Sequence, residues 1–515
     1  MPIPALRRPV VAALAALAPA LHAAPTAAQL TDEAKTARYM EQARENVPLL
    51  TAFLRDMPKG ADLHSHLSGA VYAESYLRWG AEDGACIVAR RRAMVNAPCT
   101  TSGDSVLPAS AAMESMDLWN ELVDTWSMRN WNAARENGHD QFFATFGLFS
   151  ATDRRVGDML AEAQARAAAG NAAYLELMQT ADGRAARNLG RQVGWRPDFA
   201  KMRDTLLAAG LRDAVAQARA NLTRIEARRD TVLGCGGVGK DPGCAVTVRW
   251  LYQVARANPP EQVFAQILLG FELAQADERV VGFNVVQPED NRVAMDDFAL
   301  HMRMIEFLRR LYPGVKVSLH AGELAPGLVP PEGLRASHVR QSVEVAGASR
   351  IGHGVDVMYE TNPHELLREM ARRGVMVEIN LTSNDVILGV RGADHPLRTY
   401  LAYGVPVALS TDDEGVSRSE LSQEYLKAAR EQGLDYRTLK RMARTSLEHA
   451  FIRGGGLWRD ARAFTPVAEC AAGRETPRCA AYLAANPRAR LQAELERAFA
   501  AFERKYGAMT VPTSR

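Results

Sequence analysis

The sequence predicts an α/β fold, a (β/α)8 TIM barrel with an N-terminal helical extension and disulfide-stapled insertions. Eight short apolar runs alternate with helical patterns along the chain. This alternation indicates parallel strands joined by right-handed crossovers. Polar motifs containing His, Asp and Glu follow or end four of the runs, where such a barrel holds its active site. Topology and polar motifs therefore point to the same fold independently.

The predicted elements set the domain organisation. We expect a helical extension over residues 25–56, with its helical pattern at 31–56, and a barrel over 57–455 that carries an insertion at about 70–115. Residues 456–515 are expected to form a loop and a last helix near Pro487–Lys505 that packs on the barrel. Helical patterns between strands include Val293–Leu311 and Pro363–Arg373. The predicted strands are Ala61–His66, Tyr174–Met178, Val246–Tyr252, Val280–Val286, Val315–His320, Ser349–Gly352, Val375–Ile379 and Val405–Ser410.

Residues 1–24 are typical of a secretory signal peptide. Arg7 and Arg8 form a basic start, the apolar stretch Val10–Leu21 is short for a bilayer span, and small residues follow. The alternative is an uncleaved membrane anchor. We predict export to a periplasmic or secreted location, with no membrane association once the signal is removed.

The six cysteines fall into three local pairs: Cys86 with Cys99, Cys235 with Cys244, and Cys470 with Cys479. In an oxidising compartment each pair is expected to close a short loop, stabilising the fold by on the order of 2–3 kcal/mol. No CxxC spacing supports a second zinc site instead.

Composition argues against a polyanionic or membrane-surface partner. The chain of 515 residues has a net charge of +2 and 24% charged residues, with its arginines scattered. We therefore expect no nucleic-acid partner.

Four residues are candidate ligands of one zinc ion. His64 and His66 are two apart on a predicted strand, so their side chains share one face. His320 ends another strand, and Asp412 follows the last one. Three nitrogens and one carboxylate suit zinc, although each motif alone also fits surface histidines or a helix cap.

Three further residues are candidates for proton transfer and orientation. Glu323 lies three residues after His320 and is a candidate general acid and base. His353 lies between two glycines and could orient an attacking water, although on this motif alone a structural histidine fits nearly as well. Asp413 is assigned to the substrate because adjacent carboxylates would repel unless their tasks differ.

The segment Gly234–Lys240 has the spacing of a phosphate-binding loop up to its lysine. The next residue is Asp241 rather than Ser or Thr, and no clear strand precedes the segment. We interpret it as a turn closed by Cys235 and Cys244.

Together these motifs resemble the adenosine deaminase family of the amidohydrolase superfamily, and within it the secreted adenosine deaminase-related growth factor branch. The resemblance covers about residues 57–455. It rests on Met57-Pro-Lys, His64-Ser-His66, His320-Ala-Gly-Glu323, Arg350-Ile-Gly-His-Gly354, Ser410-Thr-Asp-Asp413 and Ala443-Arg-Thr-Ser-Leu-Glu-His-Ala-Phe451.

The resemblance implies one zinc per chain and deamination of adenosine or 2′-deoxyadenosine to inosine and ammonia. Glu323 would protonate purine N1, His353 would orient the attacking water, and Asp413 would bond N7. Ser68 and Gly69 would also meet the substrate. The family usually has Asp where Ser68 lies and Gly where Gln287 lies, so we expect the floor of the pocket to differ from that of the family.

Other readings remain open. The substrate could be another aminopurine or an N6-substituted adenosine. A binuclear amidohydrolase is the enzyme alternative, but the lysine common in such sites is missing from Val280–Asp290. The non-enzyme alternative is a secreted protein that only binds purine nucleosides. By analogy with the secreted branch, residues 31–56 could mediate a homodimer.

Overall fold

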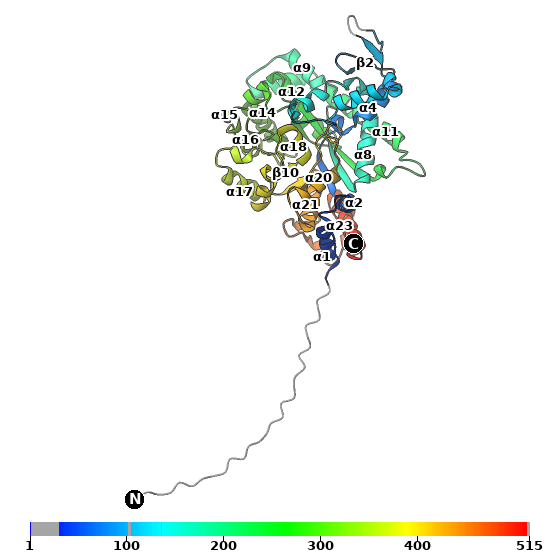
Figure 1. The fold of residues 1–515 in the computed structure, drawn as a ribbon. Coiled ribbons are helices and arrows are strands. Elements are labelled where there is room, and N and C mark those ends of the chain that lie inside the picture. The colour runs from blue at the N-terminus through cyan, green and yellow to red at the C-terminus, as the bar shows by residue number, and fades with distance from the viewer. Residues whose placement is uncertain (2–29, 101–104, 135, 512–515) are drawn as a thin grey trace.

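Eight parallel strands form one barrel-like sheet in the computed structural model, which describes Met1 and residues 30–100, 105–134 and 136–511 (Figure 1). Each barrel strand pairs with the next barrel strand along the chain, which is the strand order of a (β/α)8 barrel. The strands are β1 Gly60–His66, β5 Ala172–Gln179, β6 Thr247–Ala255, β7 Val280–Val286, β8 Lys316–Ala321, β9 Arg350–His353, β10 Met376–Ile379 and β11 Val407–Leu409.

The first and last strands meet beside the polar motifs. The His66 amide donates to the Asp412 carbonyl at 2.9 Å, and the Asp412 amide donates to the His64 carbonyl at 2.8 Å. A parallel bridge joins Ser65 to Asp412. The chain therefore closes its barrel through residues predicted to bind metal.

All eight predicted strands are confirmed; β7 has its predicted bounds, and the other seven are shifted at one or both ends. The last is shorter than the predicted Val405–Ser410 because Pro406 has no amide hydrogen to donate. Its carbonyl still accepts from the Val377 amide at 3.0 Å, so β11 keeps its register against β10.

Helices surround the sheet and bury its outer face (Figure 1). The helix α17 Pro363–Arg373 matches its prediction, whereas the predicted Val293–Leu311 is two helices separated at Asp297. The main surrounding helices are α8 Val156–Ala169, α11 Leu211–Leu233, α12 Pro260–Ala276, α14 Phe298–Leu311, α16 His338–Glu344, α18 Leu381–Leu388, α20 Leu421–Arg430 and α21 Tyr436–His449.

The N-terminal extension is two helices, α1 Asp32–Ala43 and α2 Val47–Asp56, rather than one. Asn46 separates them because its side chain caps α2 by accepting from the Leu49 amide at 3.1 Å. The extension packs against the last helix, α23 Pro487–Gly507, at one pole of the molecule (Figure 1). Rings of Phe53 and Tyr506 lie 4.7 Å apart there, so this chain itself covers the apolar face of the extension.

The insertion after the first strand contains a small antiparallel sheet in the order β3-β2-β4, which the sequence did not indicate. Its strands are Cys86–Val88, Ala93–Val95 and Val106–Pro108. Three residues each are too few for an alternating pattern to be recognised. Helices α4 Ala73–Glu82, α5 Ala111–Glu114, α6 Met116–Thr125 and α7 Gly138–Thr145 flank this sheet along the chain.

The three predicted disulfides are confirmed. The Cα atoms of Cys86 and Cys99 lie 5.4 Å apart, those of Cys235 and Cys244 also 5.4 Å, and those of Cys470 and Cys479 4.6 Å.

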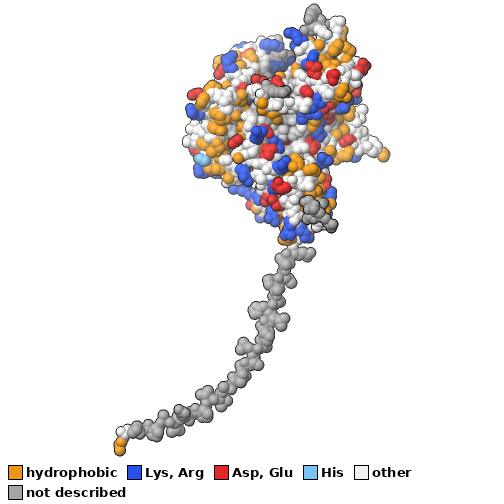
Figure 2. Space-filling view, viewed as in Figure 1, with side chains coloured by type: hydrophobic (Ala, Val, Ile, Leu, Met, Phe, Trp, Pro, Cys, Tyr) orange, Lys and Arg blue, Asp and Glu red, His pale blue; other side chains and the backbone are white. Residues whose placement is uncertain are grey.

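Charged side chains of both signs are interspersed with hydrophobic ones on the face drawn in Figure 2. Among the described residues, no helix combines the length and apolar character that a bilayer crossing needs. Apart from Met1, the predicted signal peptide falls outside the described residues.

Candidate metal centre

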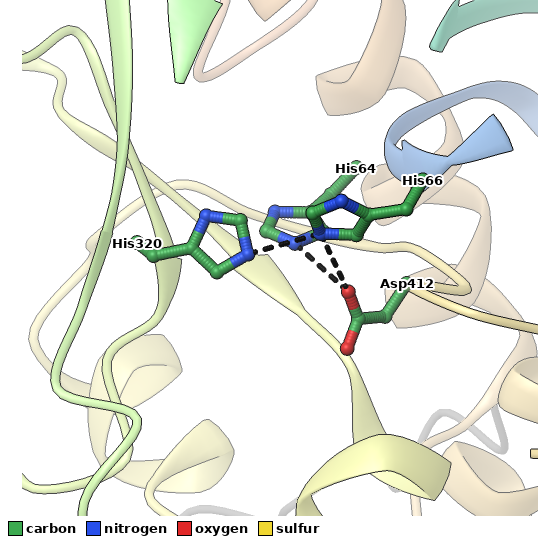
Figure 3. A group of neighbouring side chains, drawn as sticks. All are labelled: His64, His66, His320 and Asp412. Atoms are coloured by element: carbon green, nitrogen blue, oxygen red, sulfur yellow. Dashed lines mark hydrogen bonds and ion pairs between the residues drawn. The ribbon is translucent and has the colours of Figure 1, made fainter. Parts of the chain in front are cut away.

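His64, His66, His320 and Asp412 point toward one another at the carboxyl end of the barrel (Figure 3). Their donor atoms all lie within 4.8 Å of one another. Nε2 of His66 lies 3.2 Å from Nε2 of His320, and Oδ1 of Asp412 lies 3.2 Å from Nε2 of His64 and 3.3 Å from Nε2 of His66. The structure therefore brings all four predicted metal ligands together.

These distances fit a single tetrahedral ion. Ligands held at zinc bond lengths in a tetrahedron are separated by about 3.3 Å. Nε2 of His64 and Oδ1 of Asp412 are buried without a hydrogen-bond partner, which is rare for buried polar atoms. A cation would satisfy both atoms, and the set of three nitrogens and one carboxylate oxygen suits zinc.

The other ring nitrogen of each histidine has a partner from a different strand. Nδ1 of His64 lies 2.6 Å from Oε2 of Glu378, and Nδ1 of His320 lies 2.9 Å from Oδ1 of Asn284. Nδ1 of His66 lies 3.2 Å from the side-chain amide of Gln253. Glu378 and Asn284 present oxygens, which accept from Nδ1 of His64 and His320, so the Nε2 lone pairs of these two rings face the centre and the rings are held in place.

The carboxylate of Glu378 also belongs to a buried ionic chain below the histidines. Its Oε1 accepts from Ser318 Oγ at 2.8 Å and from Arg350 Nε at 2.6 Å, and Arg350 also reaches Glu176 at 2.6 Å. Although burial alone raises the pKa of Glu378, Arg350 and His64 lower it to about 2. The Glu378 carboxylate is therefore charged at neutral pH, and it can accept a hydrogen bond from Nδ1 of His64.

Positive backbone φ angles recur around the site. Gln287, His353 and Asp412 have φ of 86°, 69° and 60°. Such conformations are costly for residues other than glycine, and they cluster at functional sites where packing enforces them. At Gln287, the side-chain oxygen accepts from the Ala257 amide at 3.0 Å.

Glu323 is held in place by a second buried carboxylate. Oε1 and Oε2 of Glu289 accept from the amides of Gly322 at 3.0 Å and Glu323 at 2.9 Å, and His338 Nδ1 lies 2.6 Å from Oε1. Burial and the charge of Asp412 raise the pKa of Glu323 to about 8. At neutral pH Glu323 therefore carries a proton that it can donate.

His353 lies beside Glu323 and is neutral. Its Nε2 is 3.6 Å from Oε1 of Glu323, and its Nδ1 is 2.9 Å from the side-chain amide of Asn384. Burial lowers the pKa of His353 to about 3. Because the Asn384 amide group donates to Nδ1, the neutral ring carries its hydrogen on Nε2 and can donate from there without adding charge to the centre.

Asp413 faces the same pocket, and Gly69 makes room for it. A Cβ atom at Gly69 would lie 1.5 Å from Oδ1 of Asp413. Burial and the adjacent Asp412 raise the pKa of Asp413 well above its usual value, so it can hold a proton. Its Oδ1 has no partner in the described structure and is available to a ligand.

A pocket of about 330 Å³ lies over these groups. Its polar lining brings together the candidate ligands His66, His320 and Asp412 with Glu323, Asp413, Ser68, Gln253 and Gln287, while Phe142, Phe143, Phe146, Val286 and Pro288 supply apolar surface. His64 and His353 lie at the centre but do not line this pocket. The volume suits a small planar ligand held by a few polar groups.

Sequence reasoning missed the residues that support the ligands, namely Gln253, Asn284, Glu289 and Glu378. A signal existed for two of them, because Asn284 and Glu378 interrupt otherwise apolar strands. A polar residue buried in such a strand needs a specific partner.

The fold and the site define a parallel barrel with a candidate mononuclear metal centre at the carboxyl ends of its strands. Residues 217–455 match the family model described as "Adenosine deaminase". This part of the chain is therefore similar to adenosine deaminases.

Related adenosine deaminases align in sequence with only part of this chain. The adenosine deaminase of Shewanella loihica is 34% identical over 140 residues, which are 27% of this chain and 39% of that protein. The adenosine deaminase of Aliivibrio fischeri is 36% identical over 139 residues, 27% of this chain and 38% of its own. This chain thus spans about two fifths of the length of the curated relatives it matches.

Solved structures show the same fold over more of the chain. Arabidopsis ADAL complexed with IMP aligns with a TM-score of 0.51 and 18% identity, covering 88% of this chain and 99% of that one. Arabidopsis N6-mAMP deaminase MAPDA aligns with a TM-score of 0.50 and 19% identity, covering 78% and 96%. These likenesses confirm the (β/α)8 barrel.

Proposed function

We propose that the protein is a zinc-dependent deaminase that converts adenosine or 2′-deoxyadenosine to inosine or its 2′-deoxy analogue and ammonia, with one zinc per chain. One observation carries the proposal: four convergent metal ligands share a pocket with Glu323, a carboxylic acid that burial keeps protonated near neutral pH. Hydrolytic removal of an amino group from a purine needs a nucleophilic water and a proton for the ring.

The ligand set His64, His66, His320 and Asp412 would hold the zinc, which when bound supplies a Lewis acid that lowers the pKa of water. Glu323 gives its proton to ring N1, which makes C6 a better electrophile. His353, neutral and 3.6 Å from Glu323, orients the attacking water. Asp413, in its protonated form, donates to N7 and fixes the ring.

We further propose that the protein is exported and belongs to the secreted growth-factor-like branch of the family. The basic start at Arg7 and Arg8, the apolar stretch that follows and the three disulfides support export. A homodimer through residues 31–56 is part of the same proposal, and it must use the face of α1 and α2 turned away from α23 because their apolar face is covered.

The test is to offer a panel of aminopurines to the zinc-loaded protein and to monitor the conversion of each by its change in ultraviolet absorbance. Adenosine and 2′-deoxyadenosine should be converted, and His320→Ala should lose both zinc and activity. Conversion of only adenine or an N6-substituted adenosine would move the assignment to another aminopurine. Nucleoside binding without turnover of any aminopurine would contradict the enzyme assignment.

A further inference from the structure

A second and larger cavity adjoins the pocket of the candidate site. It has a volume of about 870 Å³. Ser68, Phe146 and Gln253 line both cavities, so the two spaces meet at these three side chains. The side-chain nitrogen of Gln253 also lies 3.2 Å from Nδ1 of His66. A ligand bound at the metal centre can therefore extend directly into this second cavity.

The lining of the second cavity is strongly cationic, with five arginines and no aspartate or glutamate. Arg228 is paired with Asp158 at 2.7 Å. Arg184, Arg187 and Arg224 form no ion pair with any carboxylate that the structure describes. The fifth arginine is Arg154.

The fold places these cations together despite their repulsion. Arg184 and Arg187 stand at the start of α9 Ala185–Val193, which follows β5 on the same rim as the metal ligands. Arg224 and Arg228 are four residues apart on α11, a spacing that sets like charges side by side. Burial and the nearby Arg184 lower the pKa of Arg187, and the opposing effects of Tyr252 and Asp182 do not offset them.

Uncharged groups at the junction suit the same ligand. Ser68 presents a hydroxyl there, where a carboxylate would repel an anion. Thr180 and Asn221 add further polar groups to the arginine-lined space. Guanidinium groups bind phosphate oxygens in paired hydrogen bonds, which makes arginine the usual residue for phosphate recognition.

We propose that the site takes a phosphorylated substrate, an aminopurine nucleotide whose base lies at the metal centre and whose phosphate lies among Arg184, Arg187 and Arg224. This inference rests on the proposed deaminase function and narrows its substrate class. The smaller pocket, about 330 Å³, holds the base and sugar, and the larger cavity receives the phosphate.

The experiment compares adenosine with its 5′- and 3′-monophosphates on the zinc-loaded full chain. One monophosphate should have a kcat/KM at least about 10-fold above that of adenosine, since a charged hydrogen bond contributes about that factor. Which isomer is preferred identifies the position of the phosphate. The advantage should shrink as ionic strength rises because salt screens partly exposed charges. Adenosine preferred over both monophosphates would overturn the inference.

Arginine variants locate the phosphate. The double variant Arg184→Gln/Arg187→Gln should lower kcat/KM for the preferred monophosphate by about 10- to 100-fold and change that for adenosine by less than about 3-fold. Arg191→Gln is the matched control on the same helix, since Arg191 does not line either cavity. An equal loss for both substrates in the double variant would refute the phosphate site.

Binding measurements test the phosphate site independently of the proposed deaminase activity. If no aminopurine is deaminated, the proposed function fails, and calorimetry with 5′-AMP, 3′-AMP and adenosine still decides the inference. Tighter binding of a monophosphate that the double variant loses supports the phosphate site. Equal affinities, or no binding of either monophosphate, overturn it.

Discussion

Glu378→Gln tests whether the buried carboxylate beneath the metal ligands prepares His64 to bind zinc. The carboxylate makes three contacts, with His64 at 2.6 Å, Ser318 at 2.8 Å and Arg350 at 2.6 Å. Glutamine keeps the shape but removes the charge, and its amide group presents hydrogens where His64 or Arg350 also donates. The variant therefore leaves one donor of this network without an acceptor.

The Glu378→Gln substitution should lower both the zinc affinity and the free energy of unfolding. Loss of the carboxylate behind a metal-binding histidine lowers metal affinity by about 10- to 100-fold. Removing one partner of a fully buried ion pair costs about 3–5 kcal/mol of unfolding free energy, because Arg350 keeps its charge. Glu176, also paired with Arg350 at 2.6 Å, should keep the loss near the lower end of that range.

The effect on stability also depends on pH. Burial raises the pKa of Glu378, but Arg350 and His64 outweigh it and hold the pKa at about 2, below the ordinary 4.5. A depressed carboxyl pKa stabilises the fold above pH 4.5, and this contribution disappears as the pH falls toward 2. The stability difference between wild type and Glu378→Gln should therefore narrow on acidification.

Zinc titration against a competing chelator and denaturant unfolding of the zinc-free protein measure the two effects separately. Glu424→Gln is the matched control, a buried carboxyl whose pKa is raised to about 7 by burial, so that about half of it is already uncharged at neutral pH. The control should keep zinc affinity and most stability. Unchanged zinc affinity in Glu378→Gln would refute the argument that this carboxylate orients His64.

Three further predictions concern the proton donor, the pocket and the insertion. Glu323→Gln should retain zinc by metal analysis while kcat falls by about 10²–10⁴-fold. In the wild type, kcat should fall as the pH rises through about 8, where Glu323 loses its proton, and the variant should lack this limb of the pH profile. Gly69→Ala should lower kcat/KM with zinc content unchanged, since its Cβ would lie 1.5 Å from Oδ1 of Asp413. Replacing Cys86 and Cys99 with alanine should cost about 2–3 kcal/mol in denaturant unfolding and leave kcat unchanged, since neither residue lines the pocket.

The eight strands and the four ligands could be predicted because their signals are local. Alternation on a strand places His64 and His66 on one face, and a parallel barrel gathers its strand ends on one rim. The disulfide pairings could be predicted for the same reason, because the paired cysteines are only 9 to 13 residues apart in the sequence.

The supporting residues depend on the register between strands, which a single sequence does not reveal. Glu378 on β10 reaches His64 on β1 across 314 residues of sequence, and Asn284 on β7 reaches His320 on β8. The arginine-lined cavity could not be predicted either, because it depends on how separate helices pack. Arg187 lies on α9 and Arg224 on α11, and in the sequence they are indistinguishable from scattered surface charges.

Breaks within predicted helices were also missed. The pattern over 31–56 continues through Asn46, but Pro48 has no amide hydrogen with which to extend α1, and the Asn46 side chain caps the start of α2 by accepting from the Leu49 amide. Similarly, the pattern over Val293–Leu311 is interrupted at Asp297. Periodicity shows which face is buried, but local backbone hydrogen bonds decide where a helix stops.

Metal content and adenosine turnover of the same purified sample test the central claim most directly. We expect one zinc per chain, with activity that is lost on chelation and restored by zinc alone. Two zinc ions per chain would contradict the mononuclear site and favour a second ion at Glu323, His353 and Asp412, which also lie within reach of one another. A protein that cannot be reconstituted with zinc would contradict the account as a whole.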